Sequence, residues 1–183
     1  GGVVLNLNNQ SNTLNNVILA ADGGSFGNQG PVISTGAGTL TLTGGVTATN
    51  LQQATTIPLI QGNLALPAGT HTFNIGTFAG APGQVGLALN STLSDAGGID
   101  KTGNGILGIG GNSPAFSGAI NVSAGALQFT SSNASIGGSA ITLSGGTVLN
   151  AGGFVGTVGS LTGTGSVTSK AGALDSHGGR INI

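Results

Sequence analysis

Glycine recurs so densely in this sequence that a helical fold is excluded. The densest stretch is residues 97–129, GGIDKTGNGILGIGGNSPAFSGAINVSAGALQF, in which apolar residues alternate with glycines and small polar residues. Each glycine in a helix interior costs about 0.5–1 kcal/mol relative to alanine. Alternation with a period of two instead sends successive side chains to opposite faces of a strand. The stretch therefore predicts two strands joined by a glycine hinge.

Weaker copies of this pattern predict a coil of stacked strands. Residues 34–45 repeat it around Gly36, and residues 161–170 repeat it around Gly163. The gaps from Gly36 to Gly103 and from Gly103 to Gly163 each match three turns of about 20–22 residues. The fold class predicted is all-β, a right-handed parallel β-helix (β-solenoid) of about eight or nine turns. We expect residues 1–183 to be a single solenoid segment and a fragment of a longer repeat protein.

The remaining sequence predicts more strands and an apolar interior. Alternating runs indicate strands at residues 3–9, 15–21 and 70–78, and residues 139–153 echo residues 39–50 as a shared strand-turn unit. Residues 51–57 are rich in threonine and precede Pro58, which favours a strand or loop over a helical turn. All six phenylalanines are expected in the interior, because no Trp or Tyr accompanies them as a binding surface would require. Phe73, Ile75 and Phe78 are the best examples.

The composition excludes several classes of partner. Only 4% of the residues are charged, three basic residues against four aspartates, whereas ordinary domains carry about 25%. An apolar content of 38% argues against disorder. The net charge of −1 gives no attraction to nucleic acid or anionic lipid, and no apolar run is long enough to insert into a membrane. The lack of cysteine excludes disulfides and thiolate metal sites and fits secretion through a bacterial periplasm.

Part of the chain resembles a known family. The positions of a K-x-G-x-G-x-L-x-L motif, and of the strand that follows it, are occupied by Lys101, Gly103, Gly105, Leu107, Ile109, Gly118, Val122, Gly125 and Leu127. Over roughly residues 86–129 the sequence is similar to the autotransporter-associated β-strand repeat (passenger-associated transport repeat) of bacterial secreted and surface proteins. The resemblance implies a parallel β-solenoid outside the cell, where the repeat is a transport and scaffold element. It implies no ligand.

Two short motifs have a chemical interpretation that the sequence does not favour. Residues 103–108, GNGILG, match G-x-G-x-x-G, but no helix is predicted to follow and no acidic residue lies about 20 positions on. Residues 175–177 place Asp175 and His177 on one face of a strand and Ser176 on the other, so the three cannot converge as a catalytic triad. A metal contact by Asp175 and His177 would lack a third ligand, and a solvated turn is favoured.

Carboxylates are too few to favour catalysis. Parallel β-helices include polysaccharide lyases and hydrolases, which use clustered carboxylates and a basic residue. The whole supply here is Asp22, Asp95, Asp100 and Asp175, with Arg180 as the single arginine. The separation of Asp22 from Asp95 is nearly the same as that of Asp100 from Asp175, and it would allow pairs to stack across turns. Asp95 and Asp100 flank a Gly-Gly turn and are predicted to be turn formers.

The last candidate functional sites are rows of threonine and glycosylation sequons. Thr39, Thr41 and Thr43 form one row and Thr70 and Thr72 a shorter one, which could order water at an ice surface but are few and irregular. Outward threonine on a strand is the favoured interpretation. Glycan sequons begin at four positions, which carry little weight in a chain rich in Asn and Ser: Asn9, Asn90, Asn121 and Asn133.

The sequence therefore predicts a non-catalytic, extracellular structural scaffold of a bacterial surface or secreted protein. No catalytic, cofactor-binding or metal-binding residue is assigned. The alternatives are a self-associating, fibre-forming or adhesive subunit and, less favoured, a polysaccharide-acting enzyme. The expected partners are other copies joined end to end, flanking repeats of the parent chain, or a surface or glycan ligand. Arg180 is the only charge near the C-terminal edge, so charge offers little protection against end-to-end association.

Overall fold

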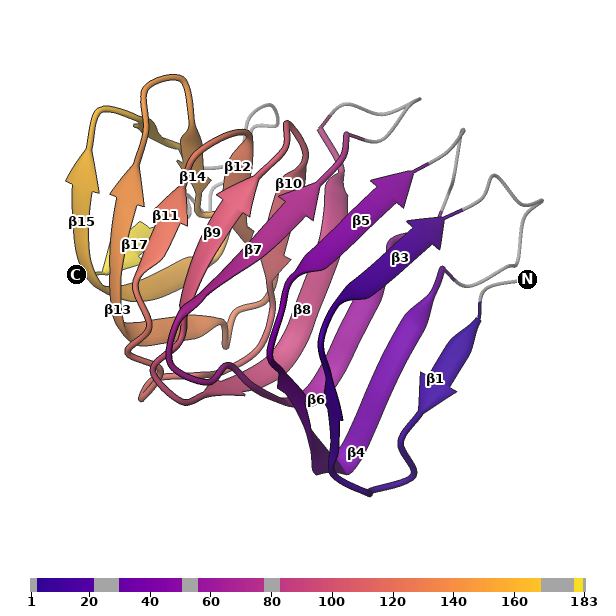
Figure 1. The fold of residues 1–183 in the computed structure, drawn as a ribbon. Coiled ribbons are helices and arrows are strands. Elements are labelled where there is room, and N and C mark those ends of the chain that lie inside the picture. Colours follow the sequence, from indigo (N-terminus) through magenta and orange to yellow (C-terminus); the bar gives the residue numbers. More distant parts are fainter. Residues whose placement is uncertain (1–2, 22–29, 51–55, 78–82, 169–179, 183) are drawn as a thin grey trace.

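Parallel strands stacked in register build the protein. A computed structural model describes residues 3–21, 30–50, 56–77, 83–168 and 180–182, and within them it contains strands and no helix (Figure 1). Successive turns of the chain lie one on another, so that each strand pairs with the strand one turn later. The predicted all-β solenoid is confirmed.

The strands form two sheets along the coil, and every described pairing is parallel. The first sheet contains β1 (Val4–Asn6), β4 (Val32–Leu42), β6 (Leu59–Ala65), β8 (Val85–Ser94), β10 (Ile106–Ile109), β12 (Ala126–Phe129), β14 (Val148–Asn150) and β16 (Ser166–Thr168), with β2 (Asn12–Leu14) also pairing with β4. The second sheet contains β3 (Val17–Ala21), β5 (Val46–Asn50), β7 (Thr70–Ile75), β9 (Gly98–Thr102), β11 (Ile120–Val122), β13 (Ser135–Leu143), β15 (Val155–Gly163) and β17 (Arg180–Asn182).

The turns are longer near the N-terminus than the sequence predicted. Val32 pairs with Leu59 and Leu59 with Ala88, so that each of these turns exceeds the expected length of about 20–22 residues. Ala88 then pairs with Gly108 and Gly108 with Gln128, which are shorter steps at the lower end of that range. About six full turns, from β4–β5 to β14–β15, lie between shorter strands at the two ends. The predicted eight or nine turns are therefore slightly too many.

The glycine-rich stretch at residues 97–129 contains four strands where two were predicted. β9, β10, β11 and β12 alternate between the two sheets, and the chain turns a corner between each pair. Gly103 lies at the first of these corners with a φ of +72°, a left-handed conformation that other residues adopt only with strain. Gly36 and Gly163, which the sequence placed at the same motif position, have φ values of +60° and +111°. The motif copies thus share a left-handed bend.

Apolar side chains from both sheets meet inside the coil in columns that run along its axis. One column is entirely leucine, each residue fully buried and paired with the next: Leu87, Leu107, Leu127 and Leu149. Burying a leucine stabilises the fold by about 1.5–3 kcal/mol. Phe73, Phe116 and Phe129 are also buried, as predicted, whereas Phe154 is only partly buried. Phe26 and Phe78 lie outside the described residues.

Gly105 packs so closely against the preceding turn that a side chain does not fit. Its N–H donates to the Ile75 carbonyl at 2.8 Å, and a Cβ there would overlap the Gly76 carbonyl oxygen. We expect Gly105→Ala to lower the free energy of unfolding by about 1–3 kcal/mol, since the backbones of two turns must separate. Gly83→Ala is the control, because a Cβ at Gly83 meets nothing within 4 Å. Urea unfolding of both variants gives the values, and equal midpoints would contradict the close-packing argument.

Candidate functional site

The titratable side chains that the structure describes are few. They are His71, Asp95, Asp100 and Lys101. Asp22, Lys170, Asp175 and His177 lie outside the described residues, and so does the side chain of Arg180. The Asp175–His177 motif therefore has no structural description. Within the described residues, no three His, Asp or Glu side chains lie together as metal ligands would.

Lys101 is a charged residue in the apolar interior of the coil. The alternation of β9 points it inward like Ile99, and it stacks between Phe73 and Val122 of the neighbouring turns. Its exposed fraction is 0%. Burial lowers the pKa of its ammonium from 10.5 to about 8, and the nearby carboxylate of Asp100 offsets part of this effect. Such a buried charge is costly unless its hydrogen-bonding groups are satisfied.

The Lys101 ammonium bonds the corners of two successive turns. Nζ donates to the carbonyl oxygens of Thr102 at 2.9 Å, Gly103 at 2.7 Å and Ala124 at 2.9 Å. An ammonium has three donors, so all of them are used. Thr102 and Gly103 belong to the corner after β9, and Ala124 belongs to the same corner one turn later. Lys101 therefore joins two turns at the left-handed bend of the motif.

The first of the two described aspartates is a turn residue and the second is not. Asp95 has a φ of +69° in the turn between β8 and β9, which confirms the predicted role. Asp100 lies instead in β9 with its side chain on the outer face, so the prediction of a turn former is wrong there. Its Oδ1 accepts a hydrogen bond from Ser123 Oγ at 2.5 Å, across to the next turn. The strand parity set by Ile99 and Lys101 decides this orientation.

His71 is buried in β7 and connects backbone carbonyls. Nδ1 lies 2.8 Å from the carbonyl oxygen of Gly44, one turn earlier, and Nε2 lies 2.8 Å from that of Pro67. A neutral imidazole can donate from only one of its nitrogens, whereas an imidazolium donates from both. The backbone of Gly97 packs directly against the imidazole, since a Cβ there would lie 2.7 Å from Nε2. The imidazole is thus buried and lies between two backbone carbonyl groups.

The G-x-G-x-x-G match forms a corner and a strand. Gly103 and Gly105 make the bend, and residues 106–109 continue as β10. A dinucleotide-binding motif requires the glycines to open a helix whose N-terminus faces the pyrophosphate. Here the glycines instead allow the corner to pack closely against the preceding turn.

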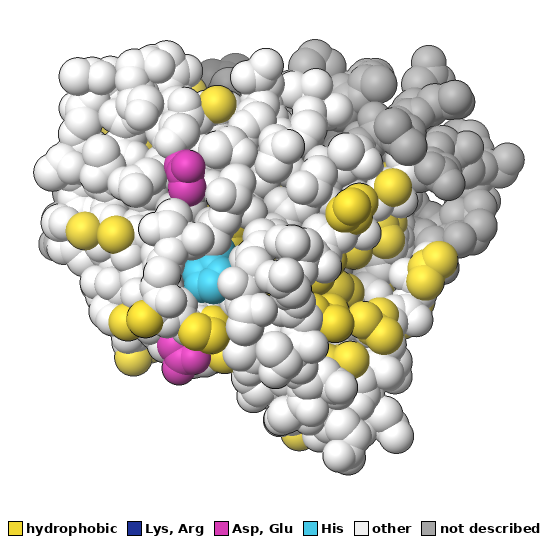
Figure 2. All heavy atoms as spheres, viewed as in Figure 1, with side chains coloured by type: hydrophobic (Ala, Val, Ile, Leu, Met, Phe, Trp, Pro, Cys, Tyr) yellow, Lys and Arg dark blue, Asp and Glu magenta, His cyan; other side chains and the backbone are white. Residues whose placement is uncertain are grey.

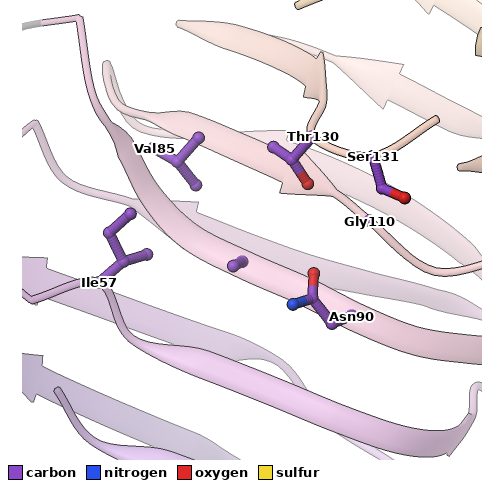
Figure 3. A pocket seen from close by; sticks show the side chains of 7 residues that line it. Ile57, Val85, Asn90, Gly110, Thr130 and Ser131 are labelled. Atoms are coloured by element: carbon purple, nitrogen blue, oxygen red, sulfur yellow. The ribbon is translucent and has the colours of Figure 1, made fainter. Parts of the chain in front are cut away.

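A shallow hollow lies on the outer face of the first sheet (Figure 3). It has a volume of about 380 Å³ and is lined by Ile57, Val85, Ala88, Asn90, Gly110, Thr130 and Ser131. Figure 3 shows Ile57 and Val85 at one end, and the Asn90 amide with the Thr130 and Ser131 hydroxyls at the other. A second hollow of about 450 Å³, which also includes Ile57, is lined by Gly30, Val32, Thr56, Ile57, Leu59 and Gln61. Neither lining contains an ionisable group, so the described residues offer neutral hydrogen bonds there but no acid or base.

The outer face of the second sheet carries columns of small polar residues. One column, defined by the strand register, contains Thr72, Asp100, Asn121, Thr142 and Thr162. Thr142 Oγ1 and Thr162 Oγ1 lie 3.3 Å apart. Figure 2 shows this face as mostly uncharged, with few acidic side chains. In the second sheet Thr72 pairs with Asp100 and Thr70 with Gly98, and in the first sheet Thr39 pairs with Asn63 and Thr41 with Ala65. The predicted threonine rows therefore do not continue toward the C-terminal end as a uniform threonine surface.

The sequons lie at exposed positions. Asn9, Asn90, Asn121 and Asn133 are all exposed, but Asn9 Oδ1 also accepts the N–H of Ala37 at 2.8 Å. A glycan would be linked to Nδ2 of Asn9, so Oδ1 could keep this bond between two turns.

Comparisons with known proteins give no relative. No family model matches the sequence, and neither a curated protein nor a solved structure matches it significantly.

Across the described residues, no helix is long and apolar enough to cross a bilayer.

Proposed function

We propose that the chain is a non-catalytic structural β-solenoid, a scaffold segment of a bacterial protein carried at the cell surface or secreted. The extracellular location comes from the resemblance of residues 86–129 to autotransporter-associated repeats and agrees with the absence of cysteine. In this role the coil would hold other parts of a larger protein away from the cell.

The proposal rests on the buried polar side chains, which form hydrogen bonds between neighbouring turns of the coil. Lys101 donates to the next turn, His71 contacts a carbonyl of the previous turn, and Ser91 Oγ donates to the Ile60 carbonyl at 3.0 Å. Ser139 Oγ donates to the Phe116 carbonyl in the same way. Catalytic groups instead converge on a cleft, where their protonation can change during a reaction. Side chains bonded between turns stabilise a rod.

A polysaccharide-acting enzyme is less well supported. Such an enzyme needs two carboxylates that face one substrate. Asp95 lies in a turn and Asp100 is bonded to Ser123 on the outer face of the second sheet, whereas the hollow of Figure 3 lies on the first sheet. The described residues thus separate the carboxylates from the hollow that could seat a sugar.

Two measurements test this proposal. Antibodies against the chain should label intact cells of the producing bacterium, and added protease should remove the label. Labelling only after permeabilisation would contradict the extracellular location. The purified chain should also release no reducing ends from a panel of neutral and acidic polysaccharides. Turnover that disappears in an Asp100→Ala, Asp175→Ala, His177→Ala triple variant would establish an enzyme in place of the scaffold.

A further inference from the structure

The outer face of the first sheet carries an apolar column beside a polar one. The register of β4, β6 and β8 defines both columns, and the two differ by two positions along each strand, so they share one face. The apolar column contains Val32, Leu59 and Ala88, and the polar column contains Ser34, Gln61 and Asn90. None of these six side chains is ionisable. The face therefore presents a neutral strip along the coil axis with one apolar side and one polar side.

The two hollows described above lie on this strip. The hollow of Figure 3 is lined in part by Ala88 and Asn90, and the second hollow by Leu59 and Gln61. Ile57 lines both hollows and is 37% exposed, so the hollows adjoin at its side chain. A ligand longer than one ring can therefore extend from one hollow to the other along the coil.

Gly110 keeps the polar end of the Figure 3 hollow open. It lies between Asn90 of the previous turn and Thr130 of the next turn. A Cβ at Gly110 would overlap Asn90 Oδ1 and would lie 2.9 Å from Thr130 Oγ1, so both oxygens face the space above this glycine. Figure 3 shows the amide and the hydroxyl on either side of Gly110, with the Ser131 hydroxyl beside them. Together these groups supply donors and acceptors of hydrogen bonds.

We propose that this strip binds a neutral oligosaccharide, with one sugar ring in each hollow. A pyranose ring has apolar C–H groups on its faces and hydroxyls around its rim. In the Figure 3 hollow the C–H face packs against Ile57 and Val85, and the hydroxyls bond Asn90, Thr130 and Ser131. Volumes of about 380 and 450 Å³ suit a small ligand, since such sites usually measure about 300–1,000 Å³. The inference goes beyond the scaffold role, which requires no ligand.

The chemistry of the lining favours a neutral sugar over other ligands. A phosphate or a uronic acid would find no cationic side chain among the lining residues, and an ammonium group would find no carboxylate. A purely apolar ligand would remove water from the Asn90 amide and the Thr130 hydroxyl without replacing its hydrogen bonds, which is costly. A sugar replaces those bonds and also covers the apolar side chains.

Isothermal titration calorimetry of the wild-type chain tests the choice of ligand. The probes are tetrasaccharides of β-1,4-linked glucose, mannose and N-acetylglucosamine, with the tetramer of galacturonic acid as the charged control. We expect at least one neutral probe to bind and the acidic probe to give no heat of binding. No binding of any neutral probe at millimolar concentration, or equal binding of the acidic one, would overturn the proposal.

Three variants test the location of the site. Gly110→Ala should weaken binding at least about tenfold, because the methyl group fills the hollow and displaces the Asn90 amide. Its Cβ meets only the ends of the Asn90 and Thr130 side chains, which can move, so the variant should melt at the wild-type temperature by circular dichroism. Thr130→Val keeps the branched shape and removes the hydroxyl, and it should weaken binding by about three- to tenfold. The matched control is Thr142→Val, on the outer face of the second sheet, which should bind like the wild type.

Two results with these variants would contradict the site. Equal affinities of Gly110→Ala and Thr142→Val would show that the sugar binds elsewhere. Tighter binding by Thr130→Val would indicate an apolar ligand in place of a sugar.

Discussion

Phe129→Ala should lower the free energy of unfolding by about 3–5 kcal/mol, the usual cost of emptying a buried aromatic site. Phe129 is fully buried in the middle of the coil and pairs with Ile109 one turn earlier. The ring also fills the space above Gly156 of the second sheet, since a Cβ there would overlap the ring carbons Cδ2 and Cε2. Removal of the ring therefore leaves a cavity between the two sheets. Equilibrium urea unfolding measures the loss.

The glycine opposite the ring supplies a matched test. Gly156→Ala alone should cost about 1–3 kcal/mol, because the methyl group forces the ring to move. In combination with Phe129→Leu the same methyl should cost less, since the shorter side chain makes room for it. The coupling between the two substitutions should be about 0.5–3 kcal/mol, as for residues in direct contact. Val155→Ala, at an exposed neighbour, should change stability by no more than about 0.5 kcal/mol. Additive costs at Phe129 and Gly156 would show that the two do not share one space.

The free energy of unfolding should rise as the pH increases from about 8 to about 10.5, because of Lys101. In the folded chain the pKa of Lys101 is lowered to about 8, whereas in the unfolded chain it returns to 10.5. Between these values the unfolded state binds more protons, so stability increases with pH. Each pKa unit corresponds to about 1.4 kcal/mol, so the difference between 10.5 and about 8 sets an upper limit of about 3.5 kcal/mol on the rise. Urea unfolding at several pH values across this range gives the slope.

Lys101→Met isolates the contribution of this one ammonium. The variant keeps a long side chain and retains the other titrating groups, including Lys170 and the N-terminus, so the difference between the two slopes belongs to Lys101. We expect the variant to lose most of the rise above pH 8. A wild-type slope in the variant, or stability that falls over this range, would contradict a buried ammonium with a lowered pKa.

The sequence predicted the fold class because glycine density and two-residue alternation leave few other structures. It did not predict the length of the turns. Gly36 lies within β4, at a bend where the register shifts between Ser34 and Thr39, whereas Gly103 lies between β9 and β10, which belong to different sheets. The two motif copies therefore occupy different corners of the coil, and their spacing is not a whole number of turns.

The buried polar residues were not predicted, although strand parity contained the signal. Lysine is almost never fully buried, so Lys101 was assigned to the first position of the repeat motif and was not expected in the interior. Alternation through Ile99 would have placed it inside. His71 shares a face with Phe73 and Ile75, which were predicted to be interior. What the sequence could not supply is the identity of the carbonyl groups that these side chains reach, because those groups belong to other turns.

The stacking of turns determines how the protein responds to a pulling force. β1 and β17 lie at opposite ends of the coil, so tension between them acts across the strands and not along them (Figure 1). The hydrogen bonds of an end turn would then break in succession, and the turns below it would remain folded because each turn contacts only its neighbours. Each turn that opens would release about 70–100 Å of chain. Under load the coil should lengthen in steps, as a series of small extensible links that absorb work before the whole chain is straightened.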